Sequence, residues 1–423
     1  MRVVCGARAP ASAPAAGRGF SRPASLPRPP VVAPVACPAG DALLVAVREA
    51  GGWVHPALFV ALQSGERGVR VRSAVSAGKP LAYVPLTYCL SAAADAPAAS
   101  GLAAQLLQLG GAHSAYLETL PPRAAAARWP LAWSDEALDA LAHPQLADAT
   151  RQERAETLAA APAGCALQDW LWACIMLRSR TYARPDGRLS LEPLMDLVNH
   201  APFETRHPGS RHRNALHSYV PPGTSSLAHL PAACASGGAA ALVTLRPLAP
   251  DEEVLVSYRD AQAGGALSAQ DSLLRYAFLP DRSDVGCVHA HALSLEDQAA
   301  ARQALAADVD AAAAAGAPPE ALLQAALAVH SRRVAAEAMR LEALCSSSVP
   351  GSPAHLAALY RRGRTLAMGR AAIARLPADV AAGEGLRAGV AAAVGCAADA
   401  DAEAAFLMRA LTGTPPPQQA LRR

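Results

Sequence analysis

Lysine is almost missing from this sequence: Lys79 is the only one, and arginine supplies nearly all of the 38 basic residues. The bias runs along the whole chain, so we interpret it as coding bias and not as the mark of a site. Five arginines precede Asp41, the first acidic residue, and without them 33 basic residues remain against 35 acidic ones. A nucleic-acid binder would carry a basic face, so we expect no nucleic-acid partner.

Charged residues are few, at 17%, while apolar residues make up 52% of the 423 positions. This composition is typical of a folded protein, and the length allows two or three domains with a sizeable core. The sequence lacks the run of about 18 apolar residues that a membrane-spanning helix needs. We therefore expect no membrane span.

The nine cysteines include no pair with C-x-x-C spacing. They predict neither a zinc site nor a disulfide framework, and we expect small core residues in a reducing compartment. They stand at Cys5, Cys37, Cys89, Cys165, Cys174, Cys234, Cys287, Cys345 and Cys396.

The first 38 residues are rich in Arg, Ala, Pro and Ser and contain no Asp or Glu. This composition is typical of an organelle transit peptide, and the central apolar segment of a secretory signal is missing. Several prolines oppose a long amphipathic helix, which favours the chloroplast stroma over the mitochondrion. A disordered N-terminal tail is the alternative interpretation.

The rest of the chain alternates between strand-like and helical patterns, which predicts an α+β protein. A helical insertion at about 91–178 interrupts a β-rich part, and the chain after 285 is helical. We therefore divide the chain into a transit peptide at 1–38, a β-rich domain at 39–284 and a helical domain at 285–423. Among the single elements we expect helices over 41–50, 103–109, 135–142, 167–178, 268–278, 320–344 and 353–376, a strand from Gly68 with its return strand over 81–86, and strands over 240–245 and 253–258.

The stretch from Leu194 to His200 is an apolar run that stops at Asn199-His200, before a proline. Polar side chains at the end of a buried segment often have a function, although Asn-His before Pro is also an ordinary turn. A loop that we expect to follow contains His207, His212 and His217, and imidazole is a common metal ligand. Their spacing of five fits neither a helix nor a strand pair, so we predict no metal site.

Arginines are concentrated in two of the expected helices. Arg178 and Arg180 close the helix that we expect over 167–178, where basic residues suit the helix dipole alone. Four more line the helix over 353–376, and a solvated face is the favoured interpretation, with a docking surface for a partner as the alternative. They are Arg361, Arg362, Arg364 and Arg370.

Several short motifs follow one another along the chain. They are Gly68-Val69, Leu177-Arg178-Ser179-Arg180-Thr181-Tyr182, Asp196-Leu197-Val198-Asn199-His200, Glu253-Val254-Leu255-Val256-Ser257-Tyr258 and Tyr276-Ala277-Phe278. Their order and spacing resemble the SET-domain methyltransferases, and most closely the plant and algal Rubisco large-subunit methyltransferase-like family. The resemblance covers about 45–380, with specific motifs only at 177–278. It implies a β-rich SET core followed by an all-α substrate-binding domain.

The resemblance also implies a cofactor, S-adenosyl-L-methionine, and roles for the matching residues. Arg67 and Gly68 would line the cofactor pocket, Asn199 and His200 would hold the cofactor largely through backbone groups, and Arg180 would meet its carboxylate, for which a guanidinium is well shaped. The methyl group of a sulfonium is already activated, so its transfer needs no metal.

Tyr276 would place its hydroxyl beside the transferred methyl group and is our first catalytic candidate, with Tyr258 as the second. Tyr258 would also shape the narrow channel for the substrate side chain. The other residues of this channel would be Ser179, Tyr182, Arg184 and Asp196. An aromatic wall would orient the amine and exclude water.

Three positions depart from the family pattern. Glu66 and Ala277 stand where the family usually has glycine, and Arg259 replaces a frequent glycine or acid. A Cβ at a glycine position can crowd a pocket or oppose a positive φ. These departures put the adenosine-side loop and the turn after Tyr276 in question.

We therefore expect an S-adenosylmethionine-dependent protein-lysine N-methyltransferase that acts on a stromal protein, for which Rubisco large subunit and aldolase are the candidates by resemblance. Histidine as the methyl acceptor is an alternative. A non-catalytic SET-fold protein that binds a partner through its C-terminal helices is another, and a metal-dependent hydrolase built on the histidines is a third.

Overall fold

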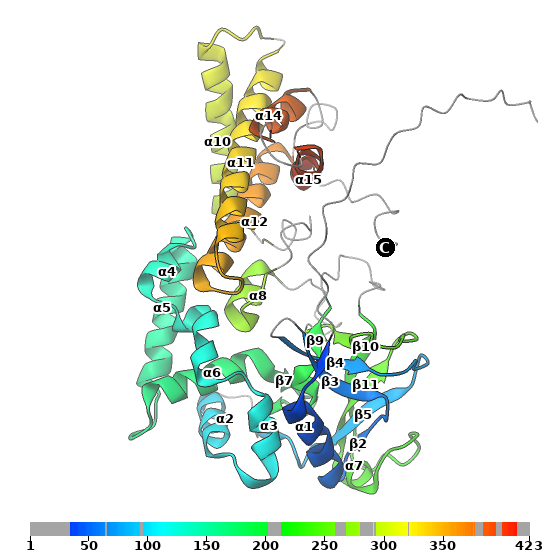
Figure 1. Ribbon diagram of the computed structural model, residues 1–423. Helices are drawn as coiled ribbons and strands as arrows, with labels where there is room; N and C mark the ends of the chain where they lie inside the picture. The colour runs from blue at the N-terminus through cyan, green and yellow to red at the C-terminus, as the bar shows by residue number, and fades with distance from the viewer. Residues whose placement is uncertain are drawn as a thin grey trace, which may run out of the picture.

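The computed structural model describes residues 34–63, 66–93, 96–201, 213–258, 268–279, 291, 293–319, 321–374, 376, 384–394 and 400–412. Figure 1 shows a β-rich part, helices packed at its side, and a tall helical bundle formed by the C-terminal segments. The α+β prediction is confirmed. Residues 1–33 of the predicted transit peptide and the predicted boundary at 284 lie outside the described residues, so both stay predictions.

In the described residues, four small sheets make up the β-rich part. Their strand orders are β1-β3-β4, β10-β11-β5-β2, β6-β8-β7 and the parallel pair β12-β9. The strands are β1 (Val35–Ala36), β2 (Trp53–Val54), β3 (Leu58–Gln63), β4 (Glu66–Val71), β5 (Pro80–Pro85), β6 (Leu90–Ala93), β7 (Thr181–Ala183), β8 (Arg188–Leu191), β9 (Asn199–His200), β10 (Ala215–Val220), β11 (Ala239–Thr244) and β12 (Leu255–Val256). Two helices, α1 (Pro38–Glu49) and α7 (Ala232–Gly237), lie against these sheets (Figure 1).

One strand pairing differs from the prediction. The strand that contains Gly68, β4, pairs with β3 before it in register Ala61 to Gly68, whereas the expected return strand β5 pairs with β11 and β2 in another sheet. The reason is that β3 is itself a nearly fully buried apolar strand, and it lies closer along the chain to β4. The hairpin therefore forms one strand earlier than predicted.

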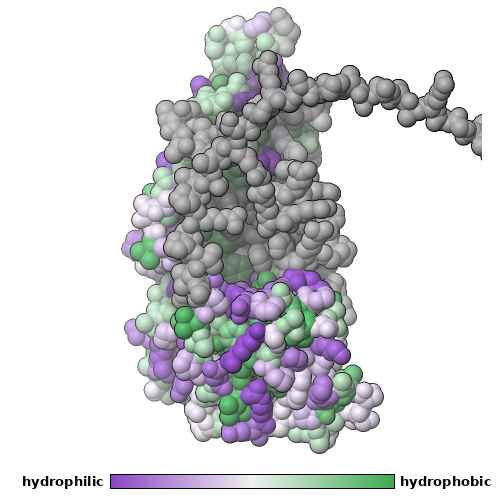
Figure 2. Space-filling model, turned by 45° about the vertical axis from the view of Figure 1, so that its right-hand side comes forward, coloured by the Kyte–Doolittle hydropathy of each residue, from purple (hydrophilic) through white to green (hydrophobic). Residues whose placement is uncertain are grey.

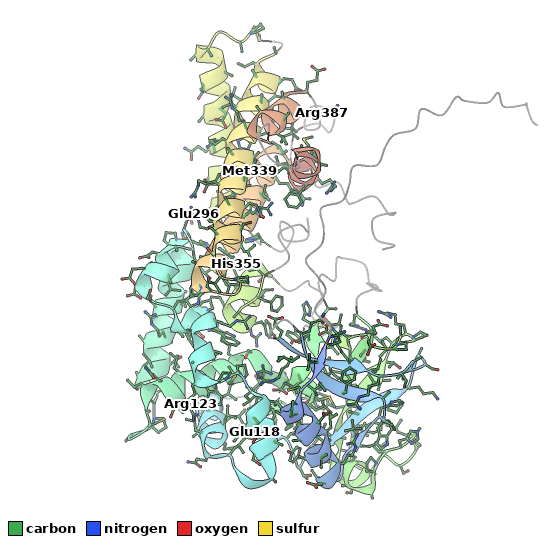
Figure 3. The ribbon with its side chains drawn as sticks, in the orientation of Figure 1. Glu118, Arg123, Glu296, Met339, His355 and Arg387 are labelled. Atoms are coloured by element: carbon green, nitrogen blue, oxygen red, sulfur yellow. The ribbon has the colours of Figure 1, made fainter. Side chains whose placement is uncertain are left out.

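Helices α2 to α6 stand between strands β6 and β7, where the sequence predicted a helical insertion. Its core includes Tyr116 and Trp170, both fully buried. Its elements are α2 (Ala96–Gln108), η1 (Gly111–His113), α3 (Ser114–Thr119), η2 (Arg123–Arg128), η3 (Pro130–Ala132), α4 (Asp135–Asp139), α5 (Pro144–Ala159) and α6 (Leu167–Arg180). In Figure 3, Glu118 and Arg123 mark the end of this insertion that lies farthest from the C-terminal bundle.

The C-terminal bundle begins at a capping box, as its sequence indicates. Ser294 accepts a hydrogen bond from the backbone of Asp297, whose side chain accepts one in return, and Ser352 caps the helix that starts at Pro353. Its helices are α10 (Leu295–Ala314), α11 (Leu322–Ser347), α12 (Pro353–Ile373), α14 (Glu384–Val394) and α15 (Ala400–Thr412). Glu296 and Met339, labelled in Figure 3, mark α10 and α11.

The arginines of α12 do not form the solvated face that the sequence favours. Arg362 is 2% exposed, lies over the ring of Phe406 and pairs with Glu342 at 3.4 Å. Arg364 pairs with Asp297 of α10 at 2.5 Å. These two guanidinium groups therefore form ion pairs inside the bundle, because the long apolar stem of an arginine can be buried while its guanidinium pairs with a carboxylate.

Among the described residues, a minor cluster around Tyr83 and Cys234 packs on one sheet, and two hydrophobic cores hold the molecule together. The larger one fills the β-rich part and the insertion and also includes Leu356, Ala357 and Tyr360 from the first turns of α12. The smaller one lies within the C-terminal bundle. The surface of the β-rich part seen in Figure 2 mixes hydrophilic and hydrophobic residues, and among the described helices none is long and apolar enough to cross a membrane.

Candidate functional site

The apolar run before Asn199 forms a tight turn. Leu194, fully buried, has φ 75° and ψ −43° and starts the short helix η4 (Met195–Leu197). A positive φ at a bulky residue is strained and persists only where surrounding packing fixes it. The turn delivers Asn199 and His200 into β9, which runs parallel to β12 in register Asn199 to Leu255.

Gly68 lies in β4 directly against the Asn199 side chain. Asn199 Nδ2 donates to the backbone oxygen of Arg67 at 3.0 Å and to Glu253 Oε1 at 2.8 Å. A Cβ at Gly68 would stand 2.5 Å from that same carboxylate oxygen. With glycine at this position, three segments pack closely without any shift of the Glu253 side chain. The sequence alone had assigned no role to Glu253 in this site.

Four rings meet beside β9. The ring centroids of Tyr258 and Tyr276 are 4.7 Å apart, His200 lies 5.2 Å from Tyr258, and Phe278 lies 6.0 Å from Tyr276. The backbone N–H of Tyr258 donates to His200 Nδ1 at 3.0 Å, which fixes the imidazole orientation. Both catalytic candidates thus stand side by side, although Tyr258 follows β12 and Tyr276 ends α8 (Ala269–Tyr276).

Burial raises the pKa of Tyr258, and Arg180 opposes that shift. A raised pKa keeps the phenol protonated at neutral pH, so Tyr258 is a hydrogen-bonding group there and not a base.

Arg180 and Asp196 form a buried pair. Arg180 Nη1 donates to the Asp196 backbone oxygen at 2.9 Å and lies 3.3 Å from Asp196 Oδ2, and the hydroxyl of Tyr116 donates to that Oδ2 at 2.9 Å. Burial raises the pKa of Asp196 although Arg180 and Tyr116 act against it. Within the described part of the chain, Asp196 Oδ1 has no hydrogen-bond partner.

The remaining channel candidates make hydrogen bonds to different parts of the fold. Tyr182 donates its hydroxyl to Met195 O at 3.0 Å. Burial raises the pKa of Tyr182, and the nearby Tyr258 acts in the same direction. Ser179 donates back to helix carbonyls of α6, and Arg184 pairs with Asp186 in its own hairpin at 2.7 Å. The guanidinium of Arg67 donates to Thr119 O in the insertion.

A buried polar network that the sequence did not indicate lies behind Tyr182. Glu192, whose side chain is fully buried, accepts hydrogen bonds from Ser190 at 2.5 Å and Tyr219 at 2.6 Å, and its other oxygen lies 2.7 Å from His217 Nε2. His217 stacks on Tyr182 with ring centroids 4.2 Å apart. A glutamate in an apolar stretch, two residues after a strand serine, was the only available signal.

The histidines of the expected loop do not stay together. His217 belongs to strand β10, which corrects the loop assignment, while His207 and His212 lie outside the described residues. Among the residues that the structure describes, no group of three His, Cys, Asp or Glu side chains could hold a metal ion.

The structure describes two of the three positions that depart from the family pattern. Glu66 begins β4 with an exposed side chain that pairs with Arg128 at 3.2 Å, so its Cβ crowds nothing in the site. Ala277 adopts a left-handed conformation with φ 52° and ends α8, which is the glycine position of a helix C-cap. Arg259 lies outside the described residues.

Comparison with known proteins gave matches only at the level of structure. No protein-family model matches the sequence, and no curated protein matches it either. A crystal structure of the SET domain of LSMT bound to lysine and AdoHcy has a TM-score of 0.53 and 15% identity, covering 79% of this chain and 90% of that one. The same domain bound to methyl-lysine and AdoHcy gives 0.51 and 14%, with 80% and 91% covered. Rubisco LSMT bound to AdoMet gives 0.50 and 13%, with 79% and 91% covered.

These matches cover nearly the whole length of the LSMT chains. The chain therefore has the SET-domain fold with a helical C-terminal part, as the motif order predicted. At such low identity the fold is conserved in outline, while the activity has to be argued from the site.

Proposed function

We propose that this SET-fold chain is a protein-lysine N-methyltransferase that uses S-adenosyl-L-methionine. The single observation that carries the proposal is the pairing of Tyr258 with Tyr276 at 4.7 Å, beside His200 on β9. The LSMT structures of the same fold hold AdoMet, AdoHcy and lysine, and they support this choice of cofactor and acceptor.

The polar groups around β9 fit the proposed cofactor. Arg180 has a side chain that is 17% exposed and is oriented by Asp196. A guanidinium held in this way can pair with the carboxylate of an amino-acid ligand. Asn199, His200, Arg67 and Gly68 would line the rest of the pocket. The cofactor supplies an activated methyl group on a sulfonium, which is transferred by in-line displacement.

The side chains of the chain itself would prepare the acceptor amine. A lysine attacks only as the neutral amine, and an apolar environment lowers its pKa. Tyr258, Tyr182 and Tyr276 would supply such walls, and their hydroxyls would orient the lone pair of the nitrogen. Ser179, Arg184 and Asp196 would lie farther along the substrate path. Alignment and exclusion of water are then the main contributions of the protein.

A stromal protein is the proposed substrate class, with Rubisco large subunit and aldolase as first candidates. The support is the composition of residues 1–38 and the resemblance to Rubisco LSMT.

The test is incubation of the purified protein, without residues 1–33 so that β1 and α1 stay intact, with methyl-labelled S-adenosylmethionine and soluble chloroplast extract. We expect label in a protein band with the parent protein and at least about a hundredfold less with Tyr276→Phe, because a misplaced reacting group costs about this much. Cofactor binding measured by calorimetry should be equal in the two. Absence of both cofactor binding and label would overturn the proposal and favour a non-catalytic scaffold.

A further inference from the structure

The turn before β9 runs from Glu192 to Asp196. The backbone N–H of Asp196 donates to Glu192 O at 3.2 Å and closes the turn, and every residue in it is buried. Its third residue, Leu194, has φ 75°. A bulky side chain keeps such a conformation only where contacts from outside the turn fix it. These contacts therefore decide how the last residue of the turn is placed.

The first contact is made by the side chain of Glu192, which is fully buried. A buried carboxylate needs hydrogen-bond donors for its oxygens. Ser190 of β8 and Tyr219 of β10 donate to Oε1, and the Nε2 of His217, also on β10, lies 2.7 Å from Oε2. Because an ionised carboxylate accepts and does not donate, this nitrogen carries a hydrogen. The start of the turn is thereby attached to β10.

The second contact also passes through His217. Its ring stacks on the ring of Tyr182, with centroids 4.2 Å apart and an angle of 27° between the planes. The hydroxyl of Tyr182 donates to Met195 O, inside the turn, at 3.0 Å. The ring of Tyr219 stands edge-on to the imidazole at 5.0 Å and helps to fix it. One histidine therefore supports the turn at its first residue, through Glu192, and at its fourth, through Tyr182.

The turn ends at the residue that orients Arg180. Asp196 accepts two hydrogen bonds from Arg180 Nη1, at its backbone oxygen at 2.9 Å and at Oδ2 at 3.3 Å. A displacement of the turn therefore moves the partner of this guanidinium. Strand β9, which follows, has supports of its own, namely its pairing with β12 and the hydrogen bonds of Asn199 to Arg67 and Glu253. A change in the turn should thus affect Arg180 and leave β9 in place.

We infer that His217 is a positioning residue: it fixes the turn that carries Asp196, and thereby the guanidinium of Arg180. The binding of the S-adenosylmethionine carboxylate by Arg180 rests on the proposed function, whereas the support of the turn by His217 does not. The two parts of the inference can therefore be measured separately.

The experiment compares His217→Phe with a matched control, His113→Phe. Each substitution keeps a ring that can stack on a tyrosine and removes a hydrogen bond of Nε2, since His113 stacks on Tyr88 at 4.7 Å and its Nε2 lies 2.9 Å from Tyr88 O. Calorimetry on each full-length protein gives the Kd of S-adenosylmethionine and of methylthioadenosine, which has the adenosine part of the cofactor but no carboxylate. Amide hydrogen exchange is measured over residues 194–200.

We expect His217→Phe to weaken the binding of S-adenosylmethionine about tenfold, because a guanidinium that loses its orientation pairs less well with a carboxylate. The Kd of methylthioadenosine should stay the same, and amide exchange over 194–200 should become faster. His113→Phe should change none of the three quantities.

An unchanged Kd of S-adenosylmethionine in His217→Phe would overturn the inference, and so would an equal loss for both ligands, which would indicate general damage to the pocket. If the parent binds neither ligand, the proposed function fails. Faster exchange in His217→Phe alone would then still support the coupling of His217 to the turn, and equal exchange would refute it.

A second variant, His217→Gln, serves if His217→Phe does not fold. It keeps an N–H donor for Glu192 and removes the ring that stacks on Tyr182, so it tests the second contact by itself. The same selective loss of S-adenosylmethionine binding is expected, and binding equal to that of the parent would overturn the inference.

Discussion

At the scale of single residues, the site combines packing constraints with a few polar groups. Gly68 leaves room for the side chains of Glu253 and Asn199, because a Cβ there would stand 2.5 Å from the Glu253 carboxylate. Ala277 is the opposite case, since it occupies a left-handed position where glycine is favoured. The chain tolerates that strain at the turn that follows Tyr276.

Ala277→Gly should stabilise the protein. Relief of a positive φ outweighs the added freedom of glycine in the unfolded chain, and we expect a gain of about 1 kcal/mol in the free energy of unfolding. Urea denaturation measures it. Ala374→Gly is the control, because Ala374 ends α12 in the right-handed region and should lose stability; gains of equal size in both variants would refute the strain argument.

The network around Glu192 gives a second prediction at this scale. Glu192→Gln turns an amide N–H₂ toward groups that donate to a carboxylate, so we expect a loss of about 1–3 kcal/mol of stability. In the Glu192→Gln background, Tyr219→Phe should cost little further stability, because the hydrogen bond that it removes is already weakened. Additive losses in a double-variant cycle, measured by urea denaturation, would contradict the network.

At the scale of elements, the buried helices could be predicted from sequence, because the spacing of their apolar residues is a local pattern. The pairing of β4 with β3 could not, since strands of similar composition compete and only the packed sheets decide. The Glu192 network was missed for a related reason: Ser190, His217 and Tyr219 lie on two strands that the sequence does not place together. The order of the motifs indicated which rings to consider for the site, whereas the distances between those rings could be read only from the folded structure.

A prediction for α8 tests whether this helix matters for more than stability. Ser268 caps it by accepting from Asp271 N at 3.0 Å, and Ser268→Ala should cost about 1 kcal/mol and also lower the rate of methyl transfer. Ser134→Ala removes the cap of α4 and should cost stability alone. Stability is measured by thermal unfolding and activity by label transfer. An equal loss of activity in both variants would contradict a specific role of α8 in methyl transfer.

At the scale of the whole molecule, the junction between the bundle and the rest should be sensitive to acid. Burial lowers the pKa of His291 from 6.5 to about 3, with Arg364 and His143 acting in the same direction. Between these values the unfolded chain binds more protons than the folded one, so stability rises with pH across that window and is lost as the pH falls.

For His291 alone, the slope should be about 1.4 kcal/mol per pH unit. His291→Gln should make the free energy of unfolding depend less on pH between about pH 5 and 6.5. His113→Gln, away from the junction, should leave the contribution of His291 to this pH dependence in place. Urea denaturation at several pH values measures this. An unaltered slope in His291→Gln would mean that His291 is not the group responsible.

Lysine is the proposed methyl acceptor of the whole molecule, and the identity of the methylated residue can be measured directly. The most direct measurement is amino-acid analysis of the protein band that the parent chain labels from methyl-labelled S-adenosylmethionine. We predict that the label is recovered as methyl-lysine and that Tyr276→Phe yields almost none. Label recovered as methyl-histidine, or equal labelling by parent and variant, would contradict the assignment of the two tyrosines to a lysine channel.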